Sequence, residues 1–344
     1  MAASAPAVLL ALPCGPEEPR GNVTTARRIG RGLVARGWSA ARCDARTDPA
    51  RWPTADVVVA LHAMHSAPRV RAVCHPAAGA PALRGRPYLV LFTGTDLNVA
   101  PSAEARAAVA DAAAAVALGA AASAQARALY PEPRGGSRVI AQGLEPLPEG
   151  PWPAEVPPPE PATDLVLLPG GVRAVKDPLR AVRALAPLAA RRPQLRLWLA
   201  GPEMEAACAA ELQAEIAAAN AAARRPWVRW LGAVPRERLR PLVESAQVVI
   251  STSRAEGGAP NALLEAAECA RTILASDIPA HREFPGSSHL FGDDADFRTK
   301  LAAALDDLPG TTGRGKELRA RVMKDFSAET EAAAWDELLR RAIA

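Results

Sequence analysis

The sequence predicts an α/β protein made of two doubly wound parallel-sheet domains in tandem. Short continuous apolar runs alternate with segments of helical periodicity, which is typical of a parallel sheet covered by helices on both faces. This alternation occurs twice, on either side of a proline-rich stretch at 145–163. The 344 residues exceed one ordinary core, and they suit two domains of about 150 residues each.

The first half of the chain begins with an apolar run that we expect to form the first strand. In the helical segment that follows, 22–37, the residues Ile29, Leu33 and Val34 recur at helical spacing. A second, alanine-rich helix is expected near 102–114. The strands expected in this half are 7–13, 55–63, 87–96, 114–120 and 137–143.

The same pattern starts again after the proline-rich stretch. Strands are expected at 164–173, 195–202, 228–234 and 246–252, with helices at 178–190 and up to about 223. The last helix, 328–344, has Trp335 to bury, and we expect it to pack back onto the first domain. We therefore assign 1–147 to an N-terminal domain, 148–163 to a linker and 164–327 to a C-terminal domain.

Composition narrows the class of protein. With 49% hydrophobic and 23% charged residues, the chain is globular rather than disordered. The net charge is +4 and the arginines are scattered, so no nucleic-acid partner is expected. No apolar run approaches the roughly 18 residues of a membrane span, and the start of the chain lacks the basic region of a signal peptide. Five widely spaced cysteines without a C-x-x-C pair indicate reduced thiols in a cytoplasmic protein.

The stretch 253–265, SRAEGGAPNALLE, has the features of an anion site. Gly257 and Gly258 allow the backbone to approach a ligand closely. The helix expected to begin near Asn261 and Ala262 presents unpaired N–H groups and the positive end of its dipole. A diphosphate fits such a site.

Two carboxylates flank this anion site. Glu256 would lie beside the group attached to the phosphate, and Glu265, inside the helix, would accept hydrogen bonds from a vicinal diol such as that of ribose. The construction suits a nucleotide sugar. The alternative is that Glu256 is a loop charge and Glu265 a helix-surface residue.

A cationic turn follows the first strand of the second domain. Gly171 allows close approach, and Arg173 and Lys176 would neutralise a diphosphate leaving group in place of a metal ion. We expect neither a metal ion nor a cofactor. The alternative is two solvated basic residues before a helix.

Polar residues also follow the strands of the first domain. His62 and His65 lie past one strand, and Thr95 and Asp96 past the next, so both pairs would face the cleft between the domains. A histidine in such a position is alternatively a structural residue. The loop and helix start after the first strand would complete an acceptor pocket able to hold an anion, and its candidates are Gly21, Asn22, Thr25 and Arg28.

The segments GGVRAVKDP (170–178), VRWLGAVP (228–235) and 251–279 resemble the donor-binding half of family 4 glycosyltransferases. The resemblance implies the GT-B fold, two Rossmann-like domains facing each other across a cleft. It also implies that Arg173 and Lys176 hold the diphosphate of a sugar nucleotide, and that Ala233 and Val234 contact the base.

In that family an E-x7-E element binds the sugar nucleotide. The resemblance implies that Glu256, with the amides of Gly257 and Gly258, touches the transferred sugar and that Glu265 binds the ribose. Eight residues separate the two carboxylates here, one more than in the family's pattern. Either Ala259 bulges in the loop or Glu256 is displaced.

Segments 20–28, 60–67 and 91–98 of the first domain are similar to a small branch of this superfamily. That branch includes the selenosugar synthase of selenoneine biosynthesis and an animal glycosyltransferase 1 domain-containing protein. The resemblance implies transfer of a hexosyl group, GlcNAc or glucose, from a UDP-sugar to a small acceptor, with selenophosphate as one candidate. Asp96 or His62 would orient or deprotonate the acceptor.

Two other functions stay open at this point. A non-catalytic or hydrolytic sugar-nucleotide-binding protein is compatible with the altered carboxylate spacing. A nicotinamide-dependent oxidoreductase is compatible with doubly wound sheets, but it requires a G-x-G-x-x-G loop. Neither 12–22 nor 168–178 contains that pattern.

Overall fold

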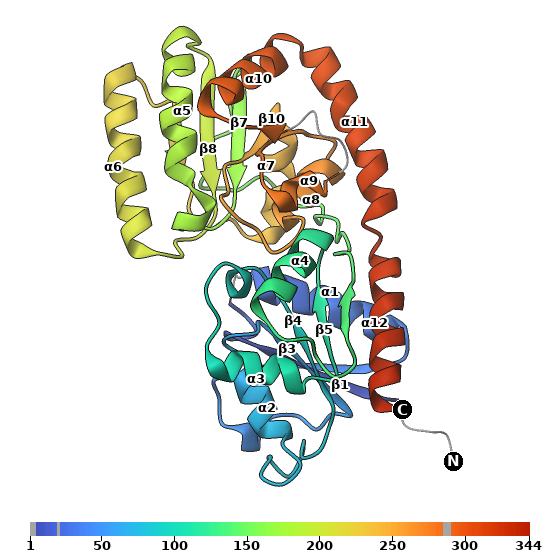
Figure 1. The fold of residues 1–344 in the computed structure, drawn as a ribbon. Coiled ribbons are helices and arrows are strands. Elements are labelled where there is room, and N and C mark those ends of the chain that lie inside the picture. Colours follow the sequence, from blue (N-terminus) through green and yellow to red (C-terminus); the bar gives the residue numbers. More distant parts are fainter. Residues whose placement is uncertain (1–4, 19–20, 285–289) are drawn as a thin grey trace. The chain divides into compact units, whose positions relative to one another are not determined.

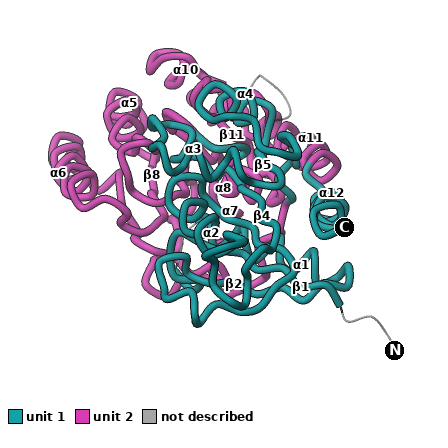
Figure 2. Tube along the Cα trace, turned by 60° about the horizontal axis from the view of Figure 1, so that its bottom comes forward, with its two compact units in different colours: residues 1–143, 256–259, 326–344 teal, residues 144–255, 260–325 magenta. Residues whose placement is uncertain are grey.

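The computed structural model describes residues 5–18, 21–284 and 290–344, which form two compact units (Figures 1 and 2). Unit 1 comprises 1–143, 256–259 and 326–344, and unit 2 comprises 144–255 and 260–325. Each unit contains one six-stranded sheet in which every pair of strands is parallel. The predicted α/β class with two doubly wound sheets is confirmed.

The sheet of unit 1 has the strand order β2-β1-β3-β4-β5-β6. Strand β2 is added on one side of β1 and all later strands on the other, so the strand order reverses between β1 and β3. Its strands are β1 Ala7–Leu12, β2 Ser39–Asp44, β3 Val57–Leu61, β4 Tyr88–Leu91, β5 Ala114–Ala117 and β6 Ser137–Val139. Five of these strands were predicted. Edge strand β2 was not predicted, because its sequence, SAARCD, contains no continuous apolar run. Most of its residues are exposed or half-buried, as an edge strand allows. Residues 1–4 and Arg20, which belong to segments considered above, lie outside the described residues.

The helices of unit 1 cover both faces of this sheet. They are α1 Gly21–Ala35, α2 Ala67–Cys74, α3 Ala103–Asp111, α4 Ala120–Leu129 and α12 Ala328–Ile343, with short 3-10 turns η1 Pro49–Arg51 and η2 Thr95–Leu97. The C-terminal helix α12 belongs to this unit and packs on α1 (Figure 1). Trp335 and Leu339 are buried in one core cluster with Ile29 and Leu33. Tight contact explains Gly32, where an added Cβ would come 2.7 Å from the Cβ of Ala332.

The sheet of unit 2 has the order β12-β11-β10-β7-β8-β9. Its strands are β7 Asp164–Pro169, β8 Leu195–Ala200, β9 Val228–Trp230, β10 Val248–Ser251, β11 Thr272–Ser276 and β12 Leu290–Phe291. Strands β8 and β9 lie on one side of β7, and β10, β11 and β12 lie on the other. The order in which strands are added therefore reverses between β7 and β10, while all neighbouring strands stay parallel, as in dinucleotide-binding sheets.

The helices of unit 2 pack on both faces of its sheet. They are α5 Pro178–Arg191, α6 Ala206–Ala223, α7 Leu239–Ser245, α8 Asn261–Glu268, α9 Pro279–Arg282, α10 Asp294–Asp306 and α11 Leu308–Asp325, with the 3-10 turns η3 Ala174–Lys176 and η4 Arg236–Arg238. The predicted helices at 178–190, before 223 and from Asn261 are confirmed. Phe291 and Phe297 stack in the core with ring centroids 4.2 Å apart.

The proline-rich stretch packs against unit 2. Residues 145–163 form neither helix nor strand, since proline cannot donate the hydrogen bonds of either. Leu147 and Val156 are nevertheless buried, and Trp152 lies edge-on to Trp198 of β8, with ring centroids 6.4 Å apart. The stretch therefore lies on unit 2, which begins at residue 144.

Within the described part of the chain, no helix is long and apolar enough to cross a membrane.

Candidate functional site

The topology of unit 2 indicates where a ligand site would form. In open α/β sheets, ligands bind outside the carboxyl ends of the strands, at the point where the strand order reverses. In unit 2 that point lies between β7 and β10. The loops that follow these two strands, 170–177 and 252–260, carry Gly171, Arg173, Lys176, Glu256, Gly257 and Gly258 of the predicted donor site.

The cationic turn is hydrogen-bonded to the chain that leaves β10. Arg173 precedes η3, Lys176 ends it, and both side chains are half-buried. The hydroxyl of Thr252 donates to the carbonyl oxygens of Lys176, at 3.1 Å, and of Asp177, at 2.8 Å. Arg254 donates from Nε to the Asp177 carboxylate at 2.8 Å. The structure thus fixes the cationic turn against the start of the glycine-containing loop.

Close backbone contacts join the loops after β7, β8 and β9. An added Cβ at Gly201 would lie 1.9 Å from the carbonyl oxygen of Gly170, so this position tolerates only glycine. Gly201 also accepts from Nε1 of Trp230 at 2.9 Å and donates to the carbonyl of Gly232 at 2.8 Å. The half-buried Val234, predicted to contact the base, follows two residues later.

Gly171 was predicted to allow close approach of a ligand, and the structure shows that its lack of a side chain is also needed for packing against Met204. An added Cβ there would come 2.5 Å from Cγ of Met204. Glu205, the next residue, accepts from the backbone N–H of Ala174 at 2.9 Å. The loop that carries Arg173 is therefore held from the β8 side as well.

Helix α8 begins at Asn261, as predicted, with Pro260 as the preceding residue. Asn261 and Ala262 lie in its first turn and are half-buried. Glu265, also half-buried, forms an ion pair with Arg236 at the start of η4. The sequence prediction missed Arg236; its position two residues after Val234 was the only local signal.

The glycine pair of the loop lies in the part of the chain that belongs to unit 1, 256–259. An added Cβ at Gly257 would come 2.5 Å from Cα of Gly94, and one at Gly258 would come 2.9 Å from Cβ of Leu118. Gly258 also has a φ of +156°. The glycines were predicted for approach to a ligand, and the structure gives them a second cause, close packing within unit 1. Glu256 belongs to the same four residues.

A buried polar cluster that the sequence analysis did not predict supports the ends of β10 and β11. His281 is fully buried, and its Nδ1 lies 2.7 Å from the carbonyl oxygen of Ser276. Because a carbonyl only accepts, Nδ1 carries the proton. The hydroxyl of Ser276 donates to the carbonyl of Ser253, and the Ser251 hydroxyl donates to Oγ of Ser253 at 3.1 Å. The cluster therefore fixes the backbone at Ser253, near the start of the loop between β10 and α8.

The predicted acceptor residues follow β1, β3 and β4, and the strand order of unit 1 reverses between β1 and β3. Gly21 and Asn22 begin α1, and Thr25 is buried within it. His62 follows β3 directly and is buried, while the nearby His65 is exposed.

Both ring nitrogens of His62 have partners. Its Nδ1 accepts from the backbone N–H groups of Met64, at 3.2 Å, and His65, at 3.3 Å. The proton is therefore assigned to Nε2, which donates to Oγ1 of Thr95 at 2.7 Å. Burial lowers the pKa of His62. The charge of Asp96 acts to raise this pKa, and the nearby His65 acts to lower it further. Its φ of +95° is rare for a non-glycine residue, and such strain concentrates at functional sites.

Asp96 joins the loops after β3 and β4. Its fully buried carboxylate accepts from the backbone N–H groups of Ala63 at 2.8 Å, Thr93 at 3.1 Å and Gly94 at 2.8 Å. Tyr130 donates to its carbonyl oxygen at 2.8 Å. The hydroxyl of Thr93 is buried and has no hydrogen-bond partner among the described residues. A buried hydroxyl of this kind calls for a water or a polar ligand group.

Arg28 differs from the other acceptor candidates because its charge is already matched. The guanidinium contacts the carboxylate of Glu331 on α12 through Nε at 2.7 Å and Nη2 at 3.0 Å. The two side chains are 4% and 2% exposed. The positive charge expected to attract an anionic acceptor is thus neutralised within unit 1.

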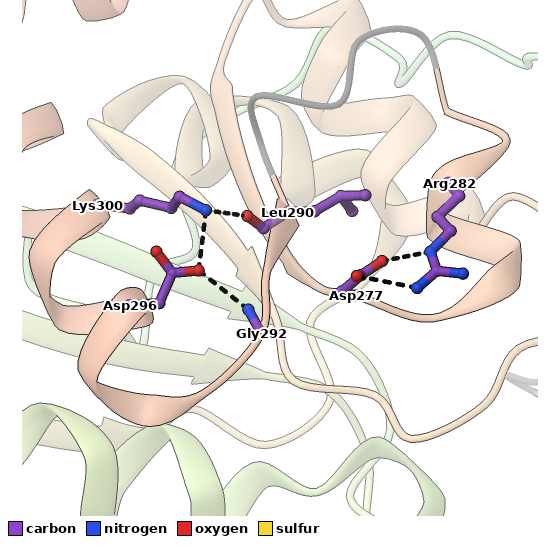
Figure 3. A pocket seen from close by; sticks show the side chains of 6 residues that line it. All are labelled: Asp277, Arg282, Leu290, Gly292, Asp296 and Lys300. Carbon is purple, nitrogen blue, oxygen red and sulfur yellow. Dashed lines mark hydrogen bonds and ion pairs between the residues drawn. The ribbon is translucent and has the colours of Figure 1, made fainter.

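A cavity of about 530 Å³ in unit 2 contains none of the predicted site residues. It is lined by Asp277, Arg282, Leu290, Gly292, Asp296 and Lys300. Figure 3 shows that its charges pair with one another, Arg282 with Asp277 at 2.6 Å and Lys300 with Asp296 at 2.8 Å. Because each cation already has a carboxylate, this cavity is a poor match for a diphosphate.

Comparison with known proteins agrees with the geometry of unit 2. Residues 163–308 match the family model of glycosyl transferases group 1. The chain is similar over 98% of its length to 98% of sucrose-phosphate synthase from Thermosynechococcus elongatus, with 16% identity and a TM-score of 0.78. Over 97% of its length it is similar to 99% of Anabaena HepE, solved with UDP and glucose, with 16% identity and a TM-score of 0.71. A glycosyltransferase from Rickettsia africae ESF-5 matches over 99% of both chains, with 12% identity and a TM-score of 0.68. At these identities the likeness establishes the fold, and the predicted GT-B fold is confirmed.

Proposed function

We propose that this chain, whose residues 163–308 match the family model of glycosyl transferases group 1, is a glycosyltransferase that moves a hexosyl group from a UDP-sugar to a small acceptor. The observation that carries the proposal is the pair of hydrogen-bonded loops at the reversal point of unit 2. HepE, which shares the fold, has been solved with UDP-glucose.

The donor diphosphate would bind between the cationic turn and the first turn of α8. Arg173 and Lys176 supply two fixed positive charges, and the N–H groups near Asn261 supply the positive end of a helix dipole. Negative charge develops on the diphosphate as the bond to the sugar breaks. Preorganised cations and N–H groups stabilise that charge without rearranging, which is the main source of rate in such sites.

The rest of the donor would extend to either side of the diphosphate. Val234 would contact the base, Glu265 the ribose, and Glu256 with the Gly257 and Gly258 amides the sugar. Two observations support this assignment: all of these residues lie in the segment that matches the family model, and they follow β9 and β10.

The acceptor would bind at the reversal point of unit 1. Gly21, Asn22 and Thr25 follow β1, and His65 and Thr95 follow β3 and β4. The buried hydroxyl of Thr93, which has no partner in the described structure, is a further candidate contact.

Selenophosphate is the acceptor that we propose for the first test, with GlcNAc or glucose as the sugar. Two observations support it: the resemblance of 60–67 and 91–98 to the selenosugar synthase, and the state of His62. Both nitrogens of His62 are engaged, so it is poorly placed to take a proton from a hydroxyl acceptor. An anionic selenium nucleophile needs no base: the selenium–carbon bond forms, the bond between the anomeric carbon and oxygen breaks, and UDP leaves with the electron pair.

Calorimetric titration with UDP tests the donor site. Arg173→Ala and Lys176→Ala should each weaken UDP binding about 10-fold or more, because each removes a charged hydrogen-bond donor. Arg183→Ala is the matched control, because Arg183 is an exposed α5 residue paired only with Glu215 among the described contacts. Unchanged affinity in both site variants would refute the assignment.

Turnover separates the remaining alternatives. The enzyme is incubated with UDP-GlcNAc or UDP-glucose and either selenophosphate or a panel of hydroxyl acceptors, and released UDP is measured. Release with selenophosphate supports the selenosugar reaction, and release only with alcohols eliminates it. UDP binding without turnover, or slow donor hydrolysis alone, identifies a sugar-nucleotide-binding protein.

A further inference from the structure

Two arginines one helical turn apart connect three parts of unit 2. Arg236, in η4, and Arg240, in α7, pair respectively with Glu265 and Glu268, which lie three residues apart on α8. Both arginines also donate to backbone carbonyls of the segment 145–147. The arrangement is a ladder of two rungs, and each rung joins α8 to the segment that enters unit 2.

The first rung contains the carboxylate proposed to bind ribose. Nη1 of Arg236 contacts Oε1 of Glu265, and its Nη2 donates to the carbonyl oxygen of Glu145 at 2.9 Å. Arg236 lies two residues after Val234, in the loop proposed to contact the base. One guanidinium therefore fixes the position of the ribose carboxylate relative to the base loop.

The second rung has similar chemistry but no link to a predicted ligand residue. Nη2 of Arg240 contacts Oε2 of Glu268 at 2.7 Å and donates to the carbonyl of Leu147, also at 2.7 Å. This rung is more deeply buried, with side chains 11% and 6% exposed against 28% and 13% for the first. The chain thus offers a built-in control for the first rung.

We propose that Arg236 is a positioning residue that holds the Glu265 carboxylate for the ribose diol and so sets the preference for ribonucleotide donors. A glutamate side chain has several rotamers, and ordering it upon binding reduces affinity. The Arg236 contact orders it beforehand. A carboxylate has about four lone-pair positions, so one contact to arginine is compatible with further bonds to hydroxyl groups. The inference rests on the proposed donor site.

The experiment compares the affinities for UDP and 2′-deoxy-UDP by calorimetry. The wild-type protein should bind UDP about 10-fold more tightly, because a hydrogen bond between a hydroxyl and a carboxylate is lost in the deoxy ligand. Arg236→Gln should bring this ratio close to one, and Arg236→Lys should restore part of it. Arg240→Gln should leave the ratio unchanged while lowering the unfolding temperature.

Each outcome has a separate meaning. If the wild type binds no UDP, the donor site itself fails and the inference fails with it. If the wild type prefers UDP and Arg236→Gln retains that preference, the inference fails and the donor site stands. The inference also fails if the wild type shows no preference, or if Arg240→Gln abolishes it as Arg236→Gln does. Glu265→Gln should abolish the preference, and adding Arg236→Gln to it should cause no further loss.

Discussion

The buried pair of Arg28 and Glu331 should contribute more to the stability of unit 1 than any exposed ion pair of the same helix. The two side chains form two hydrogen bonds, at 2.7 and 3.0 Å, and are 4% and 2% exposed. Removing one charge of such a pair leaves the other buried and unpaired, which costs about 3–5 kcal/mol. Glu331→Gln keeps the shape and one acceptor oxygen, so we expect a loss near the lower limit, about 3 kcal/mol.

Denaturant unfolding and calorimetry would measure this loss. For a unit of this size, a loss of about 3 kcal/mol corresponds to a decrease of roughly 6–12 °C in the unfolding temperature. Glu337→Gln is the matched control, because Glu337 pairs with Arg341 on α12 and both side chains are more than 60% exposed, at 64% and 68%. The control should lose about 0.5 kcal/mol or less. A loss below about 1 kcal/mol for Glu331→Gln would show that the pair does not hold α12 as we infer.

Three further predictions follow from the packing and the pKa shifts. Gly201→Ala should abolish UDP binding, because the added Cβ would lie 1.9 Å from the carbonyl oxygen of Gly170. Gly292→Ala is the control: a Cβ added there meets no atom within 4 Å, so this variant should bind UDP normally in the same titration. Burial lowers the pKa of His62 below its ordinary value of 6.5. As pH decreases, the unfolded state therefore binds a proton at this residue before the folded state does, and the free energy of unfolding should fall between about pH 7 and pH 5. Urea unfolding at several pH values should show a smaller decrease in this free energy for His62→Gln than for the wild type. Burial raises the pKa of the Cys43, Cys74 and Cys269 thiols to about 12, so a thiol reagent should label them rapidly only after unfolding, and rapid labelling of the native protein would contradict their burial.

The sequence predicted the strands and the loops because local patterns determine both. Strands β1, β3, β7 and β10 are buried on both faces, so each is a continuous apolar run. The start of α8 followed from Pro260 and the apolar spacing after it. In a parallel sheet the carboxyl ends lie at one edge, so polar residues after these strands could be assigned to a site without knowing any contact.

The partners of the charged residues could not be predicted, because they are distant in sequence. Arg28 and Glu331 are 303 residues apart, and Arg236 and Glu265 are 29 apart. Neither spacing corresponds to a helix or strand period, so no local pattern indicates the pairing. The proline-rich stretch is a similar case: its composition predicts a linker, but Arg240 binds the carbonyl of Leu147 in it.

The contacts of His62 and Asp96 bear on how the proposed transfer gains its rate. Asp96 accepts from three backbone N–H groups and His62 is engaged at both nitrogens, so both residues are used to hold the loops after β3 and β4. A general base would need an accessible lone pair within reach of the acceptor proton. The larger contribution is therefore expected from stabilising the departing diphosphate in unit 2. Arg173→Ala should accordingly lower kcat for transfer at saturating donor. His62→Gln should change kcat little with an anionic acceptor. A large loss of kcat for His62→Gln alone, in a variant that remains folded, would assign proton transfer to the histidine.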